Sequence, residues 1–194
     1  MRYCSFIRLL CLLLVIITVS GCSKAIELSS TDVILLLTRC KQFMFFCLTI
    51  LSHDPPSFNQ AASRYYYAMF SLARVIYGQQ SRSPFTKESF HVSVWNSFSK
   101  TSKEITNFGM GLKRLRERCD YGVKAEDLKP ESYKKDFKRA VYNDKVFEEL
   151  IEEIQEVYRD FPPAQGHVDQ CDQLVEEIDS IRESIKKHDC LNRN

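Results

Sequence analysis

The sequence predicts an all-α protein, and three observations lead to this prediction. Apolar residues recur every three or four positions over long stretches, as they do on one face of a helix. Strand-like alternation of apolar and polar residues is scarce, and Pro, Gly and Asn mark the breaks between the stretches. With 194 residues, the chain is long enough to build one helical core. We therefore expect an antiparallel bundle of four to five helices with an extra C-terminal helix.

The first predicted helix begins at a cap formed by Thr31 or Asp32 and ends near Leu51. Its apolar stripe steps by three or four residues and consists of Val33, Leu37, Cys40, Met44, Cys47 and Leu51. The opposite side also carries apolar residues, namely Phe43, Phe45 and Phe46. A helix that is apolar nearly all round is either the central helix of a core or part of a subunit interface.

The second predicted helix follows the break at Pro55-Pro56. Ser57 and Gln60 have the spacing of a capping box at its start, and Gly78 is expected to end it. Its buried stripe should consist of Ala62, Tyr66, Met69, Ala73 and Ile76. Because the turn between the first two helices is short, we expect them to form an antiparallel hairpin.

A polar loop at residues 79–90 and a short helical piece near residues 91–98 precede the third long helix, at about residues 102–121. The residues expected to face inward are Ile105, Phe108, Leu112, Leu115 and Cys119. Gly109 and Gly111 weaken this helix, because each costs about 1 kcal/mol relative to Ala. The two glycines predict a bend or a close helix contact.

The remainder of the chain divides into a fourth helical region, a linker and a last helix. The fourth region covers residues 130–142 and 145–161, with an interruption at Asn143-Asp144, and it completes a bundle domain at residues 31–161. Residues 162–167 form the linker, and residues 168–188 form an amphipathic helix. The apolar face of this helix consists of Cys171, Leu174, Val175, Ile178, Ile181 and Ile185. It can pack on the bundle or pair with another chain, and packing within the molecule is the more common outcome.

The N-terminus is predicted to be a signal peptide at residues 1–22. Arg2 and Arg8 make it basic, and the apolar run at residues 9–19 would rise roughly 16 Å as a helix, too short for a bilayer core of about 30 Å. The sequence VSGC at its end resembles the lipobox of bacterial lipoproteins, which implies a lipid on Cys22 and anchoring in a membrane. The alternatives are a misassigned start codon, which would leave the protein cytoplasmic, and a buried helix.

The remaining cysteines give a conflicting indication of the compartment. They are Cys40, Cys47, Cys119, Cys171 and Cys190, an odd number without a CxxC motif. Cys40 and Cys47 lie roughly 10 Å apart along one helix, beyond the reach of a disulfide, and we interpret them as small buried apolar residues. This usage favours a reducing compartment, in conflict with an exported lipoprotein.

The charge balance argues against a strong electrostatic field. The formal net charge is +2, and without residues 1–21, which contain two arginines, 25 basic and 25 acidic residues remain. Long-range steering of RNA or DNA should therefore be weak.

Three segments resemble HEPN domains (higher eukaryote and prokaryote nucleotide-binding). Residues 62–70, ASRYYYAMF, resemble the SRAYYAMF helix of that family, and residues 115–121, LRERCDY, are similar to the LRxxADY element of one bacterial branch. Between them, residues 90–98, FHVSVWNSF, are similar to an HSGVIxxF piece. Order, spacing and flanking helices agree over roughly residues 31–160. The resemblance implies a helical bundle that often dimerises through its arginine-bearing helix ends.

The resemblance also implies a function. Many HEPN proteins are metal-independent ribonucleases with an Arg-x4-6-His motif, and several are toxins paired with a nucleotidyltransferase antitoxin. In this chemistry a His moves a proton during attack of the ribose 2′-OH, and an Arg stabilises the charge on phosphorus. Here no His follows Arg114, Arg116 or Arg118 at that spacing. His91 could approach Arg116 in space, although the family element that it matches is not the catalytic one.

Three interpretations of the motif residues remain open. Arg64 and Arg116 can form ion pairs that lock the second and third helices together. Alternatively, an anion site for nucleotide or RNA is formed by Arg64, Arg114, Arg116 and Arg118. In the third interpretation, Arg116, Asp120 and Tyr121 act in RNA cleavage, but a carboxylate paired with Arg is a weak base.

The sequence contains no Gly-rich phosphate loop, metal-ligand spacing or nucleophile motif, so we expect no cofactor. We expect a HEPN-like homodimer that acts through binding. The rival interpretation is a membrane-anchored lipoprotein whose bundle is a protein-interaction module.

Overall fold

A computed structural model describes residues 28–80, 90–122, 130–160 and 166–192, and these residues form helices and no strands. The predicted all-α class is therefore confirmed. The long helices are α2 (Ser30–Leu51), α3 (Phe58–Gln80), α5 (Lys103–Tyr121), α6 (Pro130–Val141), α7 (Asp144–Arg159) and α8 (His167–Lys187). The short helices are α4 (Phe90–Ser97), which continues into a 3₁₀ turn at Phe98–Lys100, and α9 (Asp189–Asn192).

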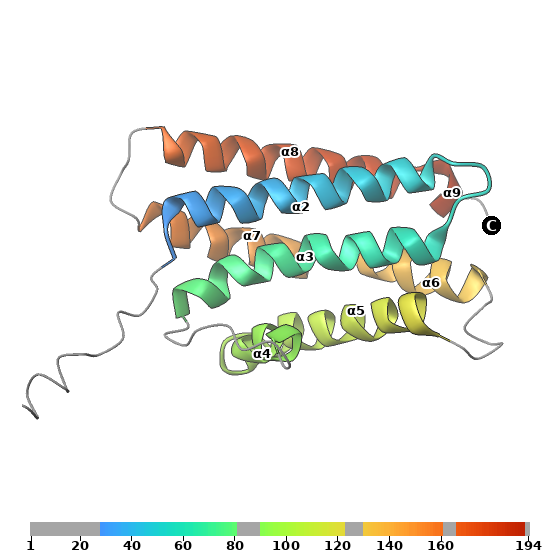
Figure 1. Cartoon of the computed structure of the whole chain (residues 1–194), viewed down its shortest axis with the longest axis horizontal. Coiled ribbons are helices and arrows are strands. Elements are labelled where there is room, and N and C mark those ends of the chain that lie inside the picture. Colours follow the sequence, from blue (N-terminus) through green and yellow to red (C-terminus); the bar gives the residue numbers. More distant parts are fainter. Residues whose placement is uncertain (1–27, 81–89, 123–129, 161–165, 193–194) are drawn as a thin grey trace, which may run out of the picture.

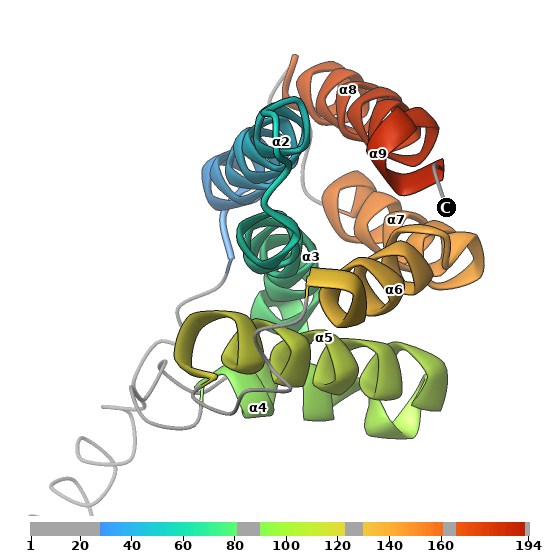
Figure 2. The same cartoon turned by 90° about the vertical axis from the view of Figure 1, so that its right-hand side faces the viewer.

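Helix α3 lies in the middle of the bundle. It contacts α2 on one side, α4 and α5 on another, and α6 and α7 on a third (Figures 1 and 2). Helices α2 and α3 form the expected antiparallel hairpin, and α8 lies along α2 (Figure 1). The C-terminal amphipathic helix thus packs within its own molecule, which is the more common of the two predicted outcomes.

The predicted apolar stripes are buried. All six stripe residues of α2 and all five of α3 are at most 2% exposed. On α5, Ile105, Leu112 and Leu115 are buried, whereas Phe108 and Cys119 are partly buried at the edge of the core. The spacing of apolar residues by three or four positions therefore identified the inward faces correctly, because each helix buries one apolar stripe against its neighbours.

The predicted start of α2 was wrong by two or three residues. Ser29, and not Thr31 or Asp32, is the N-cap: its hydroxyl accepts a hydrogen bond from the Asp32 backbone N–H at 3.2 Å. The Asp32 carboxylate accepts in return from the Ser29 backbone N–H at 3.0 Å. This reciprocal capping box satisfies two backbone donors that the helix itself cannot, so the helix begins at Ser30.

Both predicted ends of α3 also need correction. The Ser57 hydroxyl donates to Asn59 Oδ1 at 2.6 Å, and the described hydrogen bonds include no capping box with Gln60. Gly78 does not end the helix, which continues to Gln80. A Cβ at Gly78 would lie 2.9 Å from Leu28 Cδ1, so this glycine makes room for the chain that enters α2.

Helix α2 is an outer helix, so of the two predicted alternatives the central core helix is wrong, and a place in a subunit interface stays a prediction. Its outward residues Leu35, Phe45 and Phe46 are 48%, 57% and 53% exposed, while Phe43 packs on α3. Within the described part of the chain, α2 is the one helix whose length and composition would allow it to cross a membrane. One stripe of it nevertheless packs against α3 and α8.

Gly109 makes the close helix contact that the sequence predicted. A Cβ there would lie 2.0 Å from the ring of Trp95 on α4, whereas a Cβ at Gly111 would meet nothing within 4 Å. The predicted interruption between the parts of the fourth helical region is also present, because Asn143 caps α7 through a hydrogen bond from the Val146 N–H to its Oδ1. α4 and α5 therefore meet through a glycine, and α6 and α7 are separate helices.

Candidate functional site

Helix α5 presents its arginines on two different sides. Successive helical residues are rotated by about 100°, so Arg114 and Arg118 share a side and Arg116 lies on another. The helix is fixed by the N-cap Ser102, whose hydroxyl accepts a hydrogen bond from the Ile105 N–H at 3.2 Å, and by burial of Leu112 and Leu115. The arginines of α5 that were predicted to share one anion site therefore point to two different sides of the helix.

Arg116 joins α5 to α3 through aromatic rings. Its guanidinium carbon lies 5.4 Å from the ring centroid of Tyr67 and 5.2 Å from that of Tyr121. The Tyr67 ring is in turn stacked by Phe43 of α2, with the two ring centroids 5.5 Å apart. Arg116 also forms the predicted ion pair with Asp120, Nε to Oδ2 at 2.6 Å, and donates to the Tyr121 hydroxyl at 3.3 Å. We call these five residues the Tyr67 cluster.

Arg64 lies beside the Tyr67 cluster without being tied to it. The residue is exposed and precedes Tyr67 by one helical turn on the same side of α3. It forms no ion pair or hydrogen bond with other described residues. The ion pair of Arg116 lies within α5, so its contact with α3 is the ring contact with Tyr67 and not the predicted ion pair between the helices. Arg116 thus contacts Tyr67 directly, whereas Arg64 lies one helical turn before it on α3 and its donors are not engaged by the described residues.

His91, from α4, is the histidine nearest to this region. Its Nδ1 lies 2.6 Å from the Tyr66 hydroxyl, its ring stacks on Phe70 with centroids 4.2 Å apart, and its centroid lies 6.4 Å from that of Tyr67. Burial lowers the pKa of His91, and the positive charges of Arg116, Lys113 and Arg74 lower it further. The imidazole is therefore neutral near pH 7 and lies within electrostatic range of Arg116.

The candidate catalytic residues Asp120, Tyr121 and His91 are each engaged by another side chain. The Asp120 carboxylate is held in the ion pair with Arg116, and Tyr121 is 67% exposed while its hydroxyl accepts from the same arginine. His91 has one ring nitrogen engaged by Tyr66. A catalytic role for these residues remains a prediction, whereas their packing roles follow from the contacts.

The other side of α5 faces a cleft of about 580 Å³. Its walls come from α5, α6 and the start of α7, and we call it the α5–α6 cleft. Polar and charged residues in its lining are Glu104, Asn107, Arg114, Arg118, Asp136, Arg139 and Asn143. Apolar residues in its lining are Phe108, Leu112, Leu115, Ala140 and Val146. Two of the four predicted anion-binding arginines therefore line a site that is separate from the Tyr67 cluster.

Arg118 is partly neutralised in the α5–α6 cleft. Its Nη2 donates to Asp136 Oδ2 at 2.7 Å, and its guanidinium lies 5.8 Å from the Tyr133 ring centroid. Arg114 and Arg139 are exposed and form no ion pair or hydrogen bond with other described residues. The cleft consequently offers two arginines whose donors are free for a ligand.

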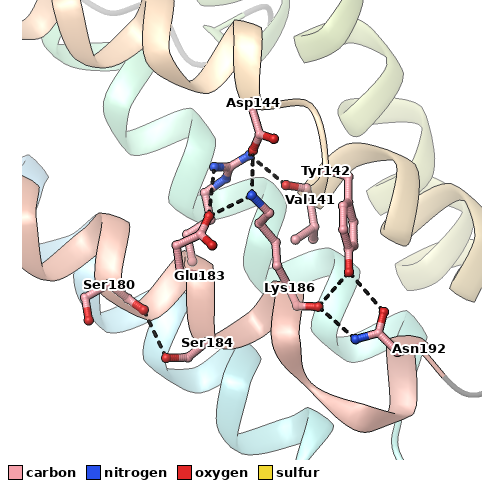
Figure 3. Close-up of polar contacts among 9 residues, drawn as sticks. Val141, Tyr142, Asp144, Ser180, Glu183, Ser184, Lys186 and Asn192 are labelled. Atoms are coloured by element: carbon pink, nitrogen blue, oxygen red, sulfur yellow. Dashed lines mark hydrogen bonds and ion pairs between the residues drawn. The ribbon is translucent and has the colours of Figure 1, made fainter.

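Among the described arginines, the one buried in the core was not predicted from the sequence. Arg182 of α8 is 2% exposed and donates to the Val141 carbonyl at 2.8 Å and to Asp144 Oδ1 at 2.6 Å. The Lys186 ammonium lies 2.9 Å from the same Asp144 oxygen and 2.7 Å from Glu183 Oε1 (Figure 3). Arg182 thereby fastens α8 to the junction of α6 and α7.

The sequence contained a signal for Arg182. It follows Ile178 by four residues and precedes Ile185 by three, so it occupies a position in the apolar stripe of α8. A charge at a stripe position is a candidate for a buried, paired group. The guanidinium also lies 4.2 Å from the Phe147 ring centroid, which adds a cation–π contact.

The cysteines of the described residues are free thiols. Cys40 and Cys47 are fully buried, as expected, and burial raises the pKa of both thiols well above the usual range. Cys22, the predicted lipidation site, lies outside the described residues. No group of three His, Cys, Asp or Glu side chains within the described ranges is placed to hold a metal ion.

Comparisons with known proteins leave the motifs as the basis of the resemblance to HEPN domains. No protein-family model, curated protein or solved structure matches this chain.

Proposed function

We propose that this chain is a HEPN-like protein that binds single-stranded RNA at Arg64 and the Tyr67 cluster, and that it acts by binding and not by cleavage. The observation that carries the proposal is the position of Arg64. It is an exposed arginine without a partner among the described residues, one turn from a tyrosine on which a second arginine lies.

The chemistry of this surface suits an unpaired nucleic acid. Bases stack on aromatic rings and on guanidinium planes, and phosphates take charge-assisted hydrogen bonds from arginine. Tyr121 is 67% exposed at the end of α5, and Phe46 is 53% exposed on the neighbouring α2. Because the formal net charge is only +2, binding should depend on these few local contacts and should show a shallow salt dependence.

Cleavage is not part of the proposal because the acid–base partner is poorly placed for it. Helix α5 lacks the motif histidine, and His91 is packed between rings with Nδ1 engaged by Tyr66. Asp120 is paired with the arginine that would stabilise the transition state.

The experiment is fluorescence anisotropy with a labelled single-stranded RNA of about 12 nucleotides, within the usual site size of such proteins. We expect Arg64→Gln and Tyr121→Ala each to weaken binding roughly tenfold, because one stacking or phosphate contact contributes about 1.4 kcal/mol. Arg159→Gln, which replaces an exposed arginine of α7, is the matched control and should bind like the parent protein. Equal binding by all four proteins would remove the proposal.

A cleavage arm uses the same RNA in the presence of EDTA. We expect the RNA to remain intact. Metal-independent cleavage that Arg116→Ala abolishes would replace the binding proposal with a ribonuclease.

The partner proposals follow from the resemblance to HEPN domains. We propose a homodimer, because the resemblance implies that the arginine-bearing helix ends meet across an interface. Sedimentation velocity of the parent protein tests it: a single monomeric species would remove the dimer proposal. A nucleotidyltransferase antitoxin is the proposed heterologous partner, and an adjacent reading frame for such a protein would support it.

A second candidate function is a membrane-anchored interaction module. The observation that favours it is α2, which is long and apolar enough to cross a membrane and exposes Leu35, Phe45 and Phe46. Metabolic labelling with a lipid precursor tests the predicted anchor: label that is lost in Cys22→Ala would support an exported lipoprotein, and absence of label in the parent protein would exclude that lipid.

A further inference from the structure

We infer that the α5–α6 cleft is a second binding site, for a small organic phosphate of mononucleotide size, separate from the Tyr67 cluster. This site is independent of RNA binding elsewhere on the bundle. The charge, shape and hydrogen-bonding groups of the cleft come from α5, α6 and the start of α7.

The charge of the α5–α6 cleft is positive and incompletely compensated. The two carboxylates in its lining are both already used: Asp136 pairs with Arg118 at 2.7 Å, and Glu104 pairs with Lys145 at 2.7 Å. Arg114 and Arg139 then face the cleft without an acidic partner among the described residues. A guanidinium offers its donors in a planar fork that matches a phosphate, so two of them form a receptor for a dianion.

The two free arginines come from different helices. Arg114 lies on α5, and Arg139 lies in the last turn of α6. Buried neighbours hold both helices in place, since Leu112 and Leu115 anchor this part of α5, and Phe137 and Val141 anchor this part of α6. A phosphate between the arginines would therefore bridge two elements whose relative position is already set by the core.

The remaining lining suits an organic group larger than phosphate. Phe108, Leu112 and Val146 belong to an apolar part of the lining, on which a flat ring or a sugar can rest. Asn107 is exposed at the cleft, and Asn143 uses its Oδ1 to cap α7, which leaves its amide NH₂ to donate. A volume of about 580 Å³ lies within the range of small-molecule sites.

Inorganic phosphate alone would leave the apolar part of the cleft unfilled, and a neutral nucleoside would leave both arginines unpaired. The site therefore requires a charged end and an apolar body in one molecule. We choose a nucleoside monophosphate as the probe because it has both.

The test is isothermal titration of the full chain with AMP, adenosine and inorganic phosphate. We expect AMP to bind at least tenfold more tightly than either of the others. The double variant Arg114→Gln/Arg139→Gln should weaken AMP binding at least tenfold and leave RNA anisotropy unchanged. Arg64→Gln should leave AMP binding unchanged, which separates this inference from the proposed RNA surface. Both cleft arginines are exposed, so circular dichroism should show native helix content in the variants.

Any of four results would overturn the inference. The first is no detectable binding of AMP, and the second is AMP binding that the double variant does not weaken. The third is AMP binding that is lost in Arg64→Gln, because the nucleotide would then occupy the Tyr67 cluster. Equal binding of AMP and inorganic phosphate would show a simple anion site and would contradict the role assigned to the apolar lining.

Discussion

The two sides of the bundle hold their helices together by different means. On the α3–α4–α5 side, ring contacts link the helices: Phe70 contacts His91 and Trp95, and Arg116 lies on Tyr67 and Tyr121. On the α6–α7–α8 side, the junction is formed around a buried charge, Arg182, with its carboxylate and carbonyl acceptors (Figure 3). Figure 2 shows these two sides below and beside the central α3.

The residue that stands out in the sequence motif and the residue expected to matter most for stability lie on different sides of the bundle. The motif arginine Arg116 is attached to a half-open aromatic surface and keeps an exposed neighbour in Arg64, an arrangement that suits a ligand. Arg182 is enclosed and its charge is neutralised within the molecule, an arrangement that suits stability. We therefore expect variants on the ionic side to change the free energy of unfolding most, and variants on the aromatic side to change binding.

The largest expected effect is that of Arg182→Met. Removing the guanidinium leaves the Val141 carbonyl without this donor and breaks the link to Asp144. The free energy of unfolding, measured by urea titration with circular dichroism, should fall by about 3 kcal/mol. Arg159→Met, which removes an arginine that is 59% exposed, should change it by less than about 0.5 kcal/mol. Similar losses in the two variants would contradict the comparison.

The next effect is on the aromatic side, at Gly109. Alanine there places a Cβ 2.0 Å from the Trp95 ring, so Gly109→Ala should lower the free energy of unfolding by about 2 kcal/mol. Gly111→Ala lies two residues away in the same helix, meets no atom within 4 Å, and should raise it by up to about 1 kcal/mol. If both alanines stabilise the protein, α4 does not pack on α5 as described.

A pH dependence should arise from His91. Because burial and neighbouring cations lower its pKa in the folded state, the unfolded chain binds the proton more readily. Its contribution to stability is therefore complete at neutral pH and is lost as pH falls below about 6.5 and through the lowered pKa of the folded state. His91→Gln retains an acceptor for Tyr66 and cannot be protonated.

The measurement for His91 is the difference in unfolding free energy between the parent protein and His91→Gln at pH 7.5, 6.0 and 5.0. The parent should lose more stability than the variant on acidification. Parallel curves would mean that the imidazole is accessible to solvent and far from Arg116.

The smallest expected effect is that of Asp120→Asn. The Arg116–Asp120 pair lies at the edge of the Tyr67 cluster, and partly exposed pairs of this spacing contribute about 0.5 kcal/mol. Arg116 would keep both ring contacts, so the helix contact should survive. A loss as large as that of Arg182→Met would show that charge pairing, and not ring packing, holds Arg116.

The spacing of apolar residues predicted the helices and their buried faces well. Each helix buries its apolar stripe, regardless of which neighbouring helix covers that stripe. The spacing did not predict helix ends where a residue serves a tertiary contact: Gly78 lies inside α3, and its missing Cβ leaves room for Leu28. It also could not assign the outer position of α2, since Phe45 and Phe46 have the composition of core residues and are exposed.

For the candidate site, the helical period places Arg114 and Arg118 on one side of α5 and Arg116 on another, and their contacts agree with this. The partner of each arginine depends on which helices pack there, so neither Arg139 in the cleft nor Tyr67 under Arg116 could be found from spacing along α5. Arg182 was missed because its partners Val141 and Asp144 are about 40 positions away in the chain.

Because Trp95 packs against Gly109, the fluorescence of this tryptophan is sensitive to the contact between α4 and α5. Trp95 is the single tryptophan and is fully buried between α4 and α5, so intrinsic fluorescence reports on the aromatic half of the bundle. Circular dichroism reports on every helix. If the two signals changed at different urea concentrations in Arg182→Met, the halves would unfold as separate cooperative units.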